Sequence, residues 1–421
     1  MTPGDSESFD KSRWLIVGLL SASIAINLVD RQILSVLAPV LRERLHLTST
    51  QYSYIVSAFQ LGMFVGQVPV GVFMDRVGTR IGLASIFMAW SMISASQALA
   101  ASMGVFVVLR FLMGVSQCGN YTAGIKAIAG LFPAARRSSA GGLFNAGAQL
   151  GSVIAPPLIV FITIRLGWQM AFVLPSTLGL LWLLPWLAKF PEQQRRGAAA
   201  SQDAASQVRM GQLMRNRKVA GLFLIRVFSG PLTTFYWFWL PEYLRTGRKM
   251  SFAMIGLLAW LPYLFGSLGN VVGGLLTDKL VRYTGSVDSA RKIGFTLSFG
   301  LSALSATLPL VRSDLLALAV ISAVLFGNQW VAATYIATVG DVVPHTLAGR
   351  VNGIAGFGDS GSTLVAMLLT GIVVDHFSYT PVFIATGSLP LLAMASVFFV
   401  LRRIERAQLG IVSAAHAEAR P

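Results

Sequence analysis

Long apolar runs, separated by short polar segments, constrain the fold of this chain more than any other feature. A helix that crosses a lipid bilayer needs about 20 predominantly apolar residues. Candidate runs lie near residues 14–39, 53–74, 81–101, 105–130, 140–164, 170–190, 219–243, 252–277, 292–311, 314–339, 350–373 and 378–401. The sequence therefore predicts an all-α membrane protein with twelve transmembrane helices.

The composition excludes several other classes of protein. Only 12% of the 421 residues are charged, whereas soluble domains have about 25%. The first run begins near Trp14 and lacks a small-residue cleavage site, so we interpret it as a retained span and not as a signal peptide. Because Cys118 is the single cysteine and the four histidines lack metal-ligand spacing, we expect no disulfide framework, no metal and no cofactor. No nucleophile–base pair is evident either, so we do not expect an enzyme.

The distribution of cations predicts the topology. A net charge of +16 would also suit a nucleic-acid-binding protein. If both termini are cytoplasmic, however, the cytoplasmic tails and loops hold 21 of the 33 Lys and Arg residues, and the outer loops hold seven. This is the positive-inside bias of membrane proteins. We therefore predict a multi-pass, monomeric protein of the bacterial inner membrane, with both termini cytoplasmic, a lipid bilayer around it and no nucleic-acid partner.

The chain repeats itself across a polar segment near its middle. Residues 192–218 are rich in Ala, Gln, Ser and Arg and predict a flexible cytoplasmic linker. Signatures before this linker recur after it, at offsets of 203 and 211 residues. Two such halves imply parallel repeats about an axis along the membrane normal. The predicted parts are an N-terminal tail, a first six-helix half, the linker, a second six-helix half and a C-terminal tail, at 1–13, 14–191, 192–218, 219–403 and 404–421.

One recurring signature is a short charged motif. It places Gly-x-x-x-Asp-Arg at residues 71–76 and Gly-x-x-x-Asp-Lys at residues 274–279. Glycine permits close approach of two helices, and the acid and its basic neighbours can form charge contacts between helices. The motif resembles the signature loop of the major facilitator superfamily, although a solvated charged turn is the alternative. The resemblance implies a gating role for Asp75, Arg76, Arg80, Asp278 and Lys279.

Charged residues also lie inside the first apolar run. Placing Arg or Asp at bilayer depth costs at least ~2.5–3.5 kcal/mol, so such residues mark substrate pathways. Asp30 and Arg31 lie past the middle of this run, and Asn27 lies on the same helical face. We expect them to face a central cavity, with Asp30 within reach of an arginine. A purely structural Asp30–Arg31 pair is the alternative.

The fourth apolar run carries a second arginine at depth. Arg110 shares a helical face with Gln117 and Tyr121. Arginine offers a planar, bidentate fork to a carboxylate. Convergence of Arg31 and Arg110 near the midplane therefore predicts a site for a carboxylate substrate, unless Arg110 is only structural.

The segments that carry these charges resemble a particular group of transporters. They are similar to the anion:cation symporter family, and especially to its hexuronate and sugar-acid permeases, which carry organic anions. The similarity covers nearly the whole chain outside the tails and the linker. The matching segments are Ile26–Arg31, Arg110–Gly114, Tyr236–Leu244, Ala259–Tyr263 and Ala290–Lys292.

The resemblance implies roles for several residues and also exposes departures. It implies that Asp30 carries a coupling proton. Gln117 stands where the family usually has a second proton-coupling glutamate, and an amide keeps the shape of a protonated carboxyl but does not titrate. Gln117 is either a natural variant with altered coupling or an introduced replacement. Leu28 and Met63 replace two family tyrosines, which removes hydroxyl partners for a polyol chain.

Further polar residues at depth complete the predicted site. Gln149 approximately matches a family glutamine that reaches sugar-acid hydroxyls, and Gln329 is a second candidate ligand. Asp359 is either a ligand or titratable group of the second half, or a packing acid paired with a neighbour. Tyr236 belongs to an aromatic run that forms either a cavity wall or an interfacial belt. We assign Arg226 to structure, because its long side chain can reach the membrane interface.

Together these observations predict a transporter that moves a small organic anion with a proton by alternating access. The expected substrate is a hexuronate or another sugar acid. Loss of the two tyrosines keeps an aromatic or short-chain carboxylate open as an alternative substrate. A passive channel, or a membrane sensor that does not transport, is the alternative from a different class.

Overall fold

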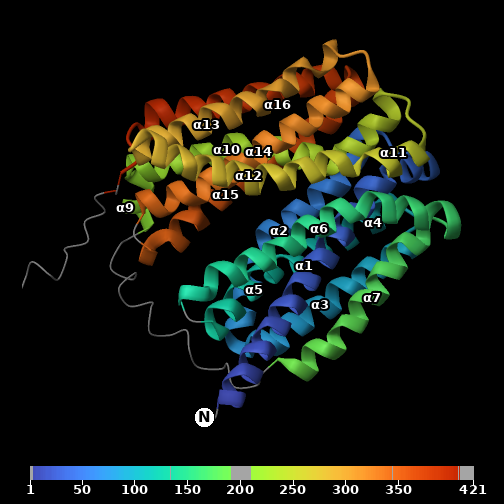
Figure 1. Cartoon of the computed structure of the whole chain (residues 1–421). Helices are drawn as coiled ribbons and strands as arrows, with labels where there is room; N and C mark the ends of the chain where they lie inside the picture. Colours follow the sequence, from blue (N-terminus) through green and yellow to red (C-terminus); the bar gives the residue numbers. More distant parts are fainter. Residues whose placement is uncertain (1–2, 133, 191–209, 344, 406, 408–421) are drawn as a thin grey trace, which may run out of the picture.

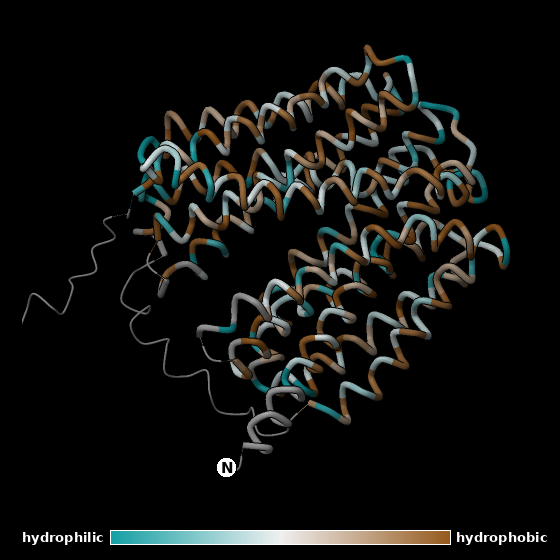
Figure 2. The backbone as a smooth tube through the Cα atoms, in the orientation of Figure 1, coloured by the Kyte–Doolittle hydropathy of each residue, from teal (hydrophilic) through white to brown (hydrophobic). Residues whose placement is uncertain are grey.

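The computed structural model describes residues 3–132, 134–190, 210–343, 345–405 and 407. Within these ranges the chain is helical and contains no strand. Twelve helical spans are long and apolar enough to cross a membrane, which confirms the predicted number. Hydrophobic residues run along the helices, and many hydrophilic residues lie where helices end or connect (Figure 2).

Each half contributes six spans, some of them built from two helical segments. The N-terminal half contains α1 (Pro3–Leu45), α2 (Ser49–Val77), α3 (Thr79–Ser96), η1 (Gln97–Leu99), α4 (Met103–Gln117), α5 (Gly119–Leu131), α6 (Ala134–Leu166) and α7 (Trp168–Lys189). The C-terminal half contains α9 (Met210–Arg215), α10 (Arg217–Glu242), η3 (Tyr243–Gly247), α11 (Phe252–Leu258), α12 (Trp260–Thr284), α13 (Val287–Ala303), η4 (Leu304–Leu310), α14 (Asp314–Val342), α15 (His345–His376), α16 (Tyr379–Ala395) and η5 (Ser396–Leu401).

Two of the segments that the sequence predicted as tail and linker contain helical residues. The expected N-terminal tail is helical from Pro3, because α1 begins there. Within the expected linker, residues 210–215 form the short helix α9, and α10 begins at Arg217. Residues 191–209 and 408–421, which include most of the predicted linker and C-terminal tail, lie outside the described residues.

The hydrophobic cores show how the two halves meet. We call the end where α7 finishes and α10 begins the linker end, and the opposite end the far end. At the far end one core is shared, since Tyr52 and Phe59 of the N-terminal half pack in the same cluster as Trp239 of the C-terminal half. At the linker end each half has a core of its own, one containing Trp186 and the other Val342. The two halves therefore join at the far end and diverge toward the linker end (Figure 1).

Glycines bring the backbones of particular helices into contact within the N-terminal half. A Cβ at Gly114 of α4 would lie 2.2 Å from the carbonyl oxygen of Phe59 in α2. A Cβ at Gly147 of α6 would lie 2.1 Å from the carbonyl oxygen of Ser21 in α1. Small residues permit such close approach of membrane helices. These contacts hold α4 against α2 and α6 against α1, and so fix the helices that carry Arg110 and Arg31.

Candidate functional site

A polar cavity of about 520 Å³ lies between the two halves, with lining residues from both. Helices α1, α2, α4, α5 and α6 form its N-terminal wall, and α10, α14 and α15 form its C-terminal wall. This volume suits a small organic molecule. The predicted site residues that line the cavity are Asn27, Arg31, Gln117, Tyr121, Gln149, Gln329 and Asp359.

Arg31 is the cation that the N-terminal wall presents to the cavity. Its Nη2 donates to Asn27 Oδ1 at 3.4 Å and approaches Met63 Sδ at 4.0 Å. Its guanidinium lies 5.1 Å from the ring centroid of Phe59. Its Nε is buried without a hydrogen-bond partner, and none of the described carboxylates pairs with it. A guanidinium with free donors beside a cavity is suited to bind a carboxylate.

Arg110 lies behind this wall and is fully buried. Its guanidinium is 5.9 Å from the same Phe59 ring, so α4 and α1 bring the two arginines to one aromatic side chain. Its Nη1 contacts only Met113 Sδ, at 3.6 Å, while Nε and Nη2 have no partner among the described residues. The structure thus brings Arg31 and Arg110 together, with Arg31 facing the cavity and Arg110 next to it.

Asp30 is placed differently from the sequence expectation. It does not line the cavity, and its carboxylate lies toward α3. Trp90 Nε1 donates to its Oδ2 at 3.2 Å, and Ser94 Oγ donates to its Oδ1 at 3.4 Å. These two hydrogen bonds hold the Asp30 side chain against α3, so it does not face the cavity as the sequence predicted. Asp30 still interacts electrostatically with Arg110, although it forms no ion pair with either arginine.

Gln117 contributes further unsatisfied polar atoms to the N-terminal wall. Its side chain is buried beside the cavity, and neither its Nε2 nor its Oε1 has a hydrogen-bond partner in the described part of the chain. Asn27 Nδ2 is unpartnered in the same way. Tyr121 is half exposed at the cavity surface, with its ring against Phe144. The N-terminal wall therefore has donors in excess of acceptors.

The C-terminal wall carries hydroxyls, amides and a paired acid. Thr233 Oγ1 donates to Asn328 Oδ1 at 2.6 Å. Gln329 lines the cavity, and its backbone carbonyl accepts from Asn270 Nδ2 at 3.4 Å. Gln149 belongs to the opposite wall, but its Oε1 accepts from Ser267 Oγ of the C-terminal half at 2.7 Å. This hydrogen bond joins α6 to α12 across the edge of the cavity.

Asp359 of α15 forms an ion pair with Arg226 of α10, and both residues line the cavity. The sequence left open whether Asp359 is a ligand or an acid paired with a neighbour. The structure shows the pairing, and a ligand role stays a prediction. It also places Arg226 at the cavity surface, whereas the sequence suggested only a structural role for this residue.

Tyr236 does not line the cavity. It is fully buried, and its hydroxyl shares a hydrogen bond of 2.7 Å with Ser305 Oγ. The next two residues of the aromatic run, Trp237 and Phe238, line the cavity instead. We therefore leave Tyr236 out of the proposed ligand set.

Comparison with known proteins identifies the family. The model of the Major Facilitator Superfamily matches residues 20–287 and 222–421. The chain belongs to this superfamily. It is 29% identical over 406 residues to the hexuronate transporter of Escherichia coli (strain K12), covering 93% of this chain and 94% of that protein.

Other relatives support the same family. The chain is 28% identical over 426 residues to the probable galactarate/D-glucarate transporter of Bacillus subtilis (strain 168), covering 94% and 93% of the two chains. A crystal structure of a D-xylose-proton symporter has the same fold, with a TM-score of 0.76, 16% identity and coverage of 92% and 98%. This major facilitator superfamily protein is thus a multi-pass membrane transporter and not an enzyme.

The charged motifs of the superfamily lie at the linker end. Arg80 Nη2 donates to the carbonyl oxygen of Leu187, within the N-terminal half. In the C-terminal half, Arg291 bonds Asp278 at 3.4 Å and Asp341 at 2.9 Å. Of the other predicted gate residues, Arg76 and Lys279 are exposed. The side chain of Asp75 lies outside the described residues. These contacts of Arg80 and Arg291 tie helices together within each half.

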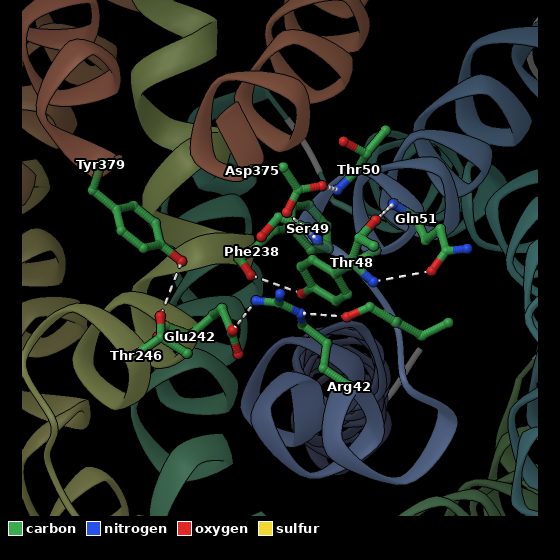
Figure 3. Close-up of polar contacts among 12 residues, drawn as sticks. Arg42, Thr48, Ser49, Thr50, Gln51, Phe238, Glu242, Thr246, Asp375 and Tyr379 are labelled. Carbon is green, nitrogen blue, oxygen red and sulfur yellow. Dashed lines mark hydrogen bonds and ion pairs between the residues drawn. The ribbon is translucent and has the colours of Figure 1, made fainter. Parts of the chain in front are cut away.

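The far end contains contacts between the halves that sequence reasoning did not anticipate. Arg42 of α1 forms an ion pair with Glu242 of α10 (Figure 3). Asp375, at the end of α15, accepts from the backbone nitrogens of Ser49 and Thr50 at 2.7 and 2.6 Å. A carboxylate at the N-terminus of α2 also interacts favourably with the helix dipole.

Two hydrogen bonds to the backbone of α10 close this end further. Tyr52 donates its hydroxyl to the carbonyl oxygen of Phe238 at 2.8 Å. Ser35 donates to the carbonyl oxygen of Trp237, also at 2.8 Å. Trp237 and Phe238 line the cavity, so these two bonds join the halves directly beside it.

Proposed function

We propose that this protein is a proton-coupled symporter of sugar acids, with a hexuronate as the preferred substrate, working by alternating access. The observation that carries the proposal is a group of unpartnered buried donors on the N-terminal wall and directly behind it. On the wall they are Asn27 Nδ2 and Arg31 Nε, and behind it they are Arg110 Nε and Nη2. Unsatisfied buried donors cost about 1–3 kcal/mol each, and more when charged. A carboxylate with four lone-pair sites would satisfy several of them at once.

In the proposed complex, Arg31 binds the substrate carboxylate directly. Arg110 completes the cationic surroundings from behind, next to the shared Phe59 ring. In this proposal the hydroxyls of the sugar contact polar side chains that line both walls, namely Asn27, Gln117, Tyr121 and Gln149 on the N-terminal wall and Gln329 on the opposite one. The sugar-acid relatives support this substrate class.

We assign the coupling proton to Asp30. Its carboxylate is fully buried and lies within electrostatic range of Arg110. A charged Asp30 compensates the arginines in the empty carrier, and a neutral Asp30 leaves them available to the substrate. Proton and substrate then favour each other's binding, because the coupling between two sites is reciprocal.

We also propose which side of the membrane each end of the molecule faces. The cationic residues of tails and loops favour a cytoplasmic linker end, in a monomer of the bacterial inner membrane. The cavity would then be sealed on the outside by the far-end contacts of Arg42, Tyr52 and Asp375. Transport requires these contacts to break while the linker ends of the two halves approach each other.

Counterflow in proteoliposomes tests the proposed activity. Vesicles loaded with unlabelled D-galacturonate and diluted into labelled D-galacturonate should take up label transiently above its equilibrium level. A passive channel would equilibrate the label without an overshoot, and a sensor without transport would take up none. Either result would contradict the proposal.

A second substrate class has its own support. Leu28 and Met63 both line the cavity, where they present apolar surface in place of hydroxyls. This favours an aromatic or short-chain carboxylate. Benzoate and lactate should therefore be included as competitors, and stronger inhibition by either than by D-galacturonate would decide for this alternative.

A further inference from the structure

The two walls of the cavity differ in how their cations are compensated. On the N-terminal wall, Arg31 has no carboxylate partner among the described residues. On the C-terminal wall, Arg226 is paired with Asp359, and about a third of its side chain and a fifth of that of Asp359 remain exposed. One wall therefore offers a net positive charge to a ligand, and the other offers a neutral ion pair.

Residues of neighbouring helices pack closely around the Arg226–Asp359 pair. A Cβ at Gly230 of α10 would lie 1.7 Å from Asp359 Oδ1 and 3.1 Å from Thr363 Oγ1, so the carboxylate occupies the space that any larger side chain at position 230 would need. The guanidinium of Arg226 lies 5.6 Å from the ring centroid of Tyr335. The hydroxyl of Tyr335 is buried without a hydrogen-bond partner, and this residue lines the cavity too.

We propose that the Arg226–Asp359 pair determines substrate specificity, by selecting sugar acids with one carboxylate over those with two. This inference rests on the proposed function, since it concerns the part of the same substrate that is remote from its carboxylate. With the carboxylate of the substrate at Arg31, its remote end meets the C-terminal wall. Hydroxyls there can accept from Arg226 and donate to Asp359.

A second carboxylate at the remote end meets a different environment. Asp359 already occupies Arg226 and repels a further negative charge, which is how a binding site excludes a competing ligand. The relatives of this chain include transporters named for monocarboxylates and for dicarboxylates. In our proposal the paired acid makes this protein a transporter of monocarboxylates, because the C-terminal wall offers no free cation to a second carboxylate.

The test measures competition between D-galacturonate and D-galactarate. Uptake of labelled D-galacturonate is measured with increasing amounts of each unlabelled compound. The ratio of the two inhibition constants gives the preference for D-galacturonate over D-galactarate. The wild-type protein should prefer D-galacturonate by about tenfold or more. Asp359→Asn should shift the ratio toward D-galactarate by at least about tenfold, because Arg226 then becomes available to the second carboxylate.

Two further variants make the result specific. Arg226→Gln/Asp359→Asn removes both charges, so the wild-type preference should weaken without the additional gain for D-galactarate. Asp288→Asn unpairs Lys292 within α13, outside the cavity, and should leave the ratio unchanged. If Asp359→Asn does not fold, the inference is tested with the double variant, which leaves no unpaired Arg226 in the protein.

The outcomes separate the two proposals. Absence of sugar-acid uptake by the wild-type protein would contradict the proposed function. Uptake with equal inhibition by both compounds in the wild-type protein would overturn the specificity inference alone. So would a ratio that stays within about twofold of wild type in both Asp359→Asn and the double variant.

Discussion

Glu242 of α10 and Arg42 of α1 form an ion pair that joins the two halves at the far end, with the Glu242 side chain only 1% exposed. The pair lies among other contacts between the halves, including the bond from Tyr52 to the carbonyl of Phe238. At the linker end each half keeps a separate core. The far-end contacts therefore stabilise the conformation described here.

Glu242→Gln should destabilise the closed far end. Breaking a buried pair by removing one partner costs about 3–5 kcal/mol, so a conformation with the far end open should become populated. Spin labels at the exposed positions His46 and Lys249, after Cys118→Ser, should report a new, longer distance. Asp288→Asn breaks an ion pair within α13 and should leave the distance unchanged. An identical distance distribution in Glu242→Gln and wild type would show that the pair does not hold this end.

Asp30→Asn should uncouple transport from the proton. The amide keeps the acceptor for Trp90 and the size of the side chain but does not titrate. We expect counterflow of D-galacturonate to persist, while accumulation driven by a pH gradient is lost. The measurement is uptake into proteoliposomes with and without an imposed gradient. If the variant still concentrates substrate, another group carries the proton, and Asp359 becomes the candidate.

Gln117→Glu should strengthen proton coupling. Gln117 lines the cavity with both polar atoms of its amide unpartnered, so a carboxyl fits the same space and adds a titratable group. Gradient-driven uptake should increase over the wild-type level and acquire a new pH dependence. Equal uptake and an unchanged pH profile in the two forms would show that Asp30 alone suffices.

Gly230→Ala should disturb the Arg226–Asp359 pair without changing any charge. The added methyl group collides with the Asp359 carboxylate, and overpacking of this kind costs about 1–3 kcal/mol. We expect a lower unfolding temperature in detergent and weaker binding of D-galacturonate. Gly361→Ala is the matched control, because a Cβ there meets nothing within 4 Å. Equal behaviour of the two variants would contradict the packing argument.

The sequence predicted the spans and part of the site. Apolar length alone determines which segments can cross a bilayer, and the twelve spans follow from it. Arg31 was predicted at the cavity because a cation at membrane depth requires a polar environment. Asn27, four residues earlier, was correctly placed on its face, and the two side chains are bonded.

The rest of the site depends on tertiary structure. Asp30 turns toward α3 because Trp90 and Ser94, some 60 residues away, supply its hydrogen bonds. The Arg226–Asp359 pair joins residues 133 positions apart, and no local pattern marks them as partners. The Asp359 carboxylate also fills the space next to Gly230, a contact that only the folded chain shows.

Binding of D-galacturonate to arginine variants tests the central claim most directly. Isothermal titration in detergent should detect binding to the wild-type protein and to Arg165→Ala, in which an exposed arginine at the end of α6 is removed. Removing one member of a buried charged contact costs at least about 2 kcal/mol, so Arg31→Ala and Arg110→Ala should each bind at least about 30-fold more weakly. Both variants should remain folded by size-exclusion chromatography. Undiminished binding in folded Arg31→Ala and Arg110→Ala would contradict the account.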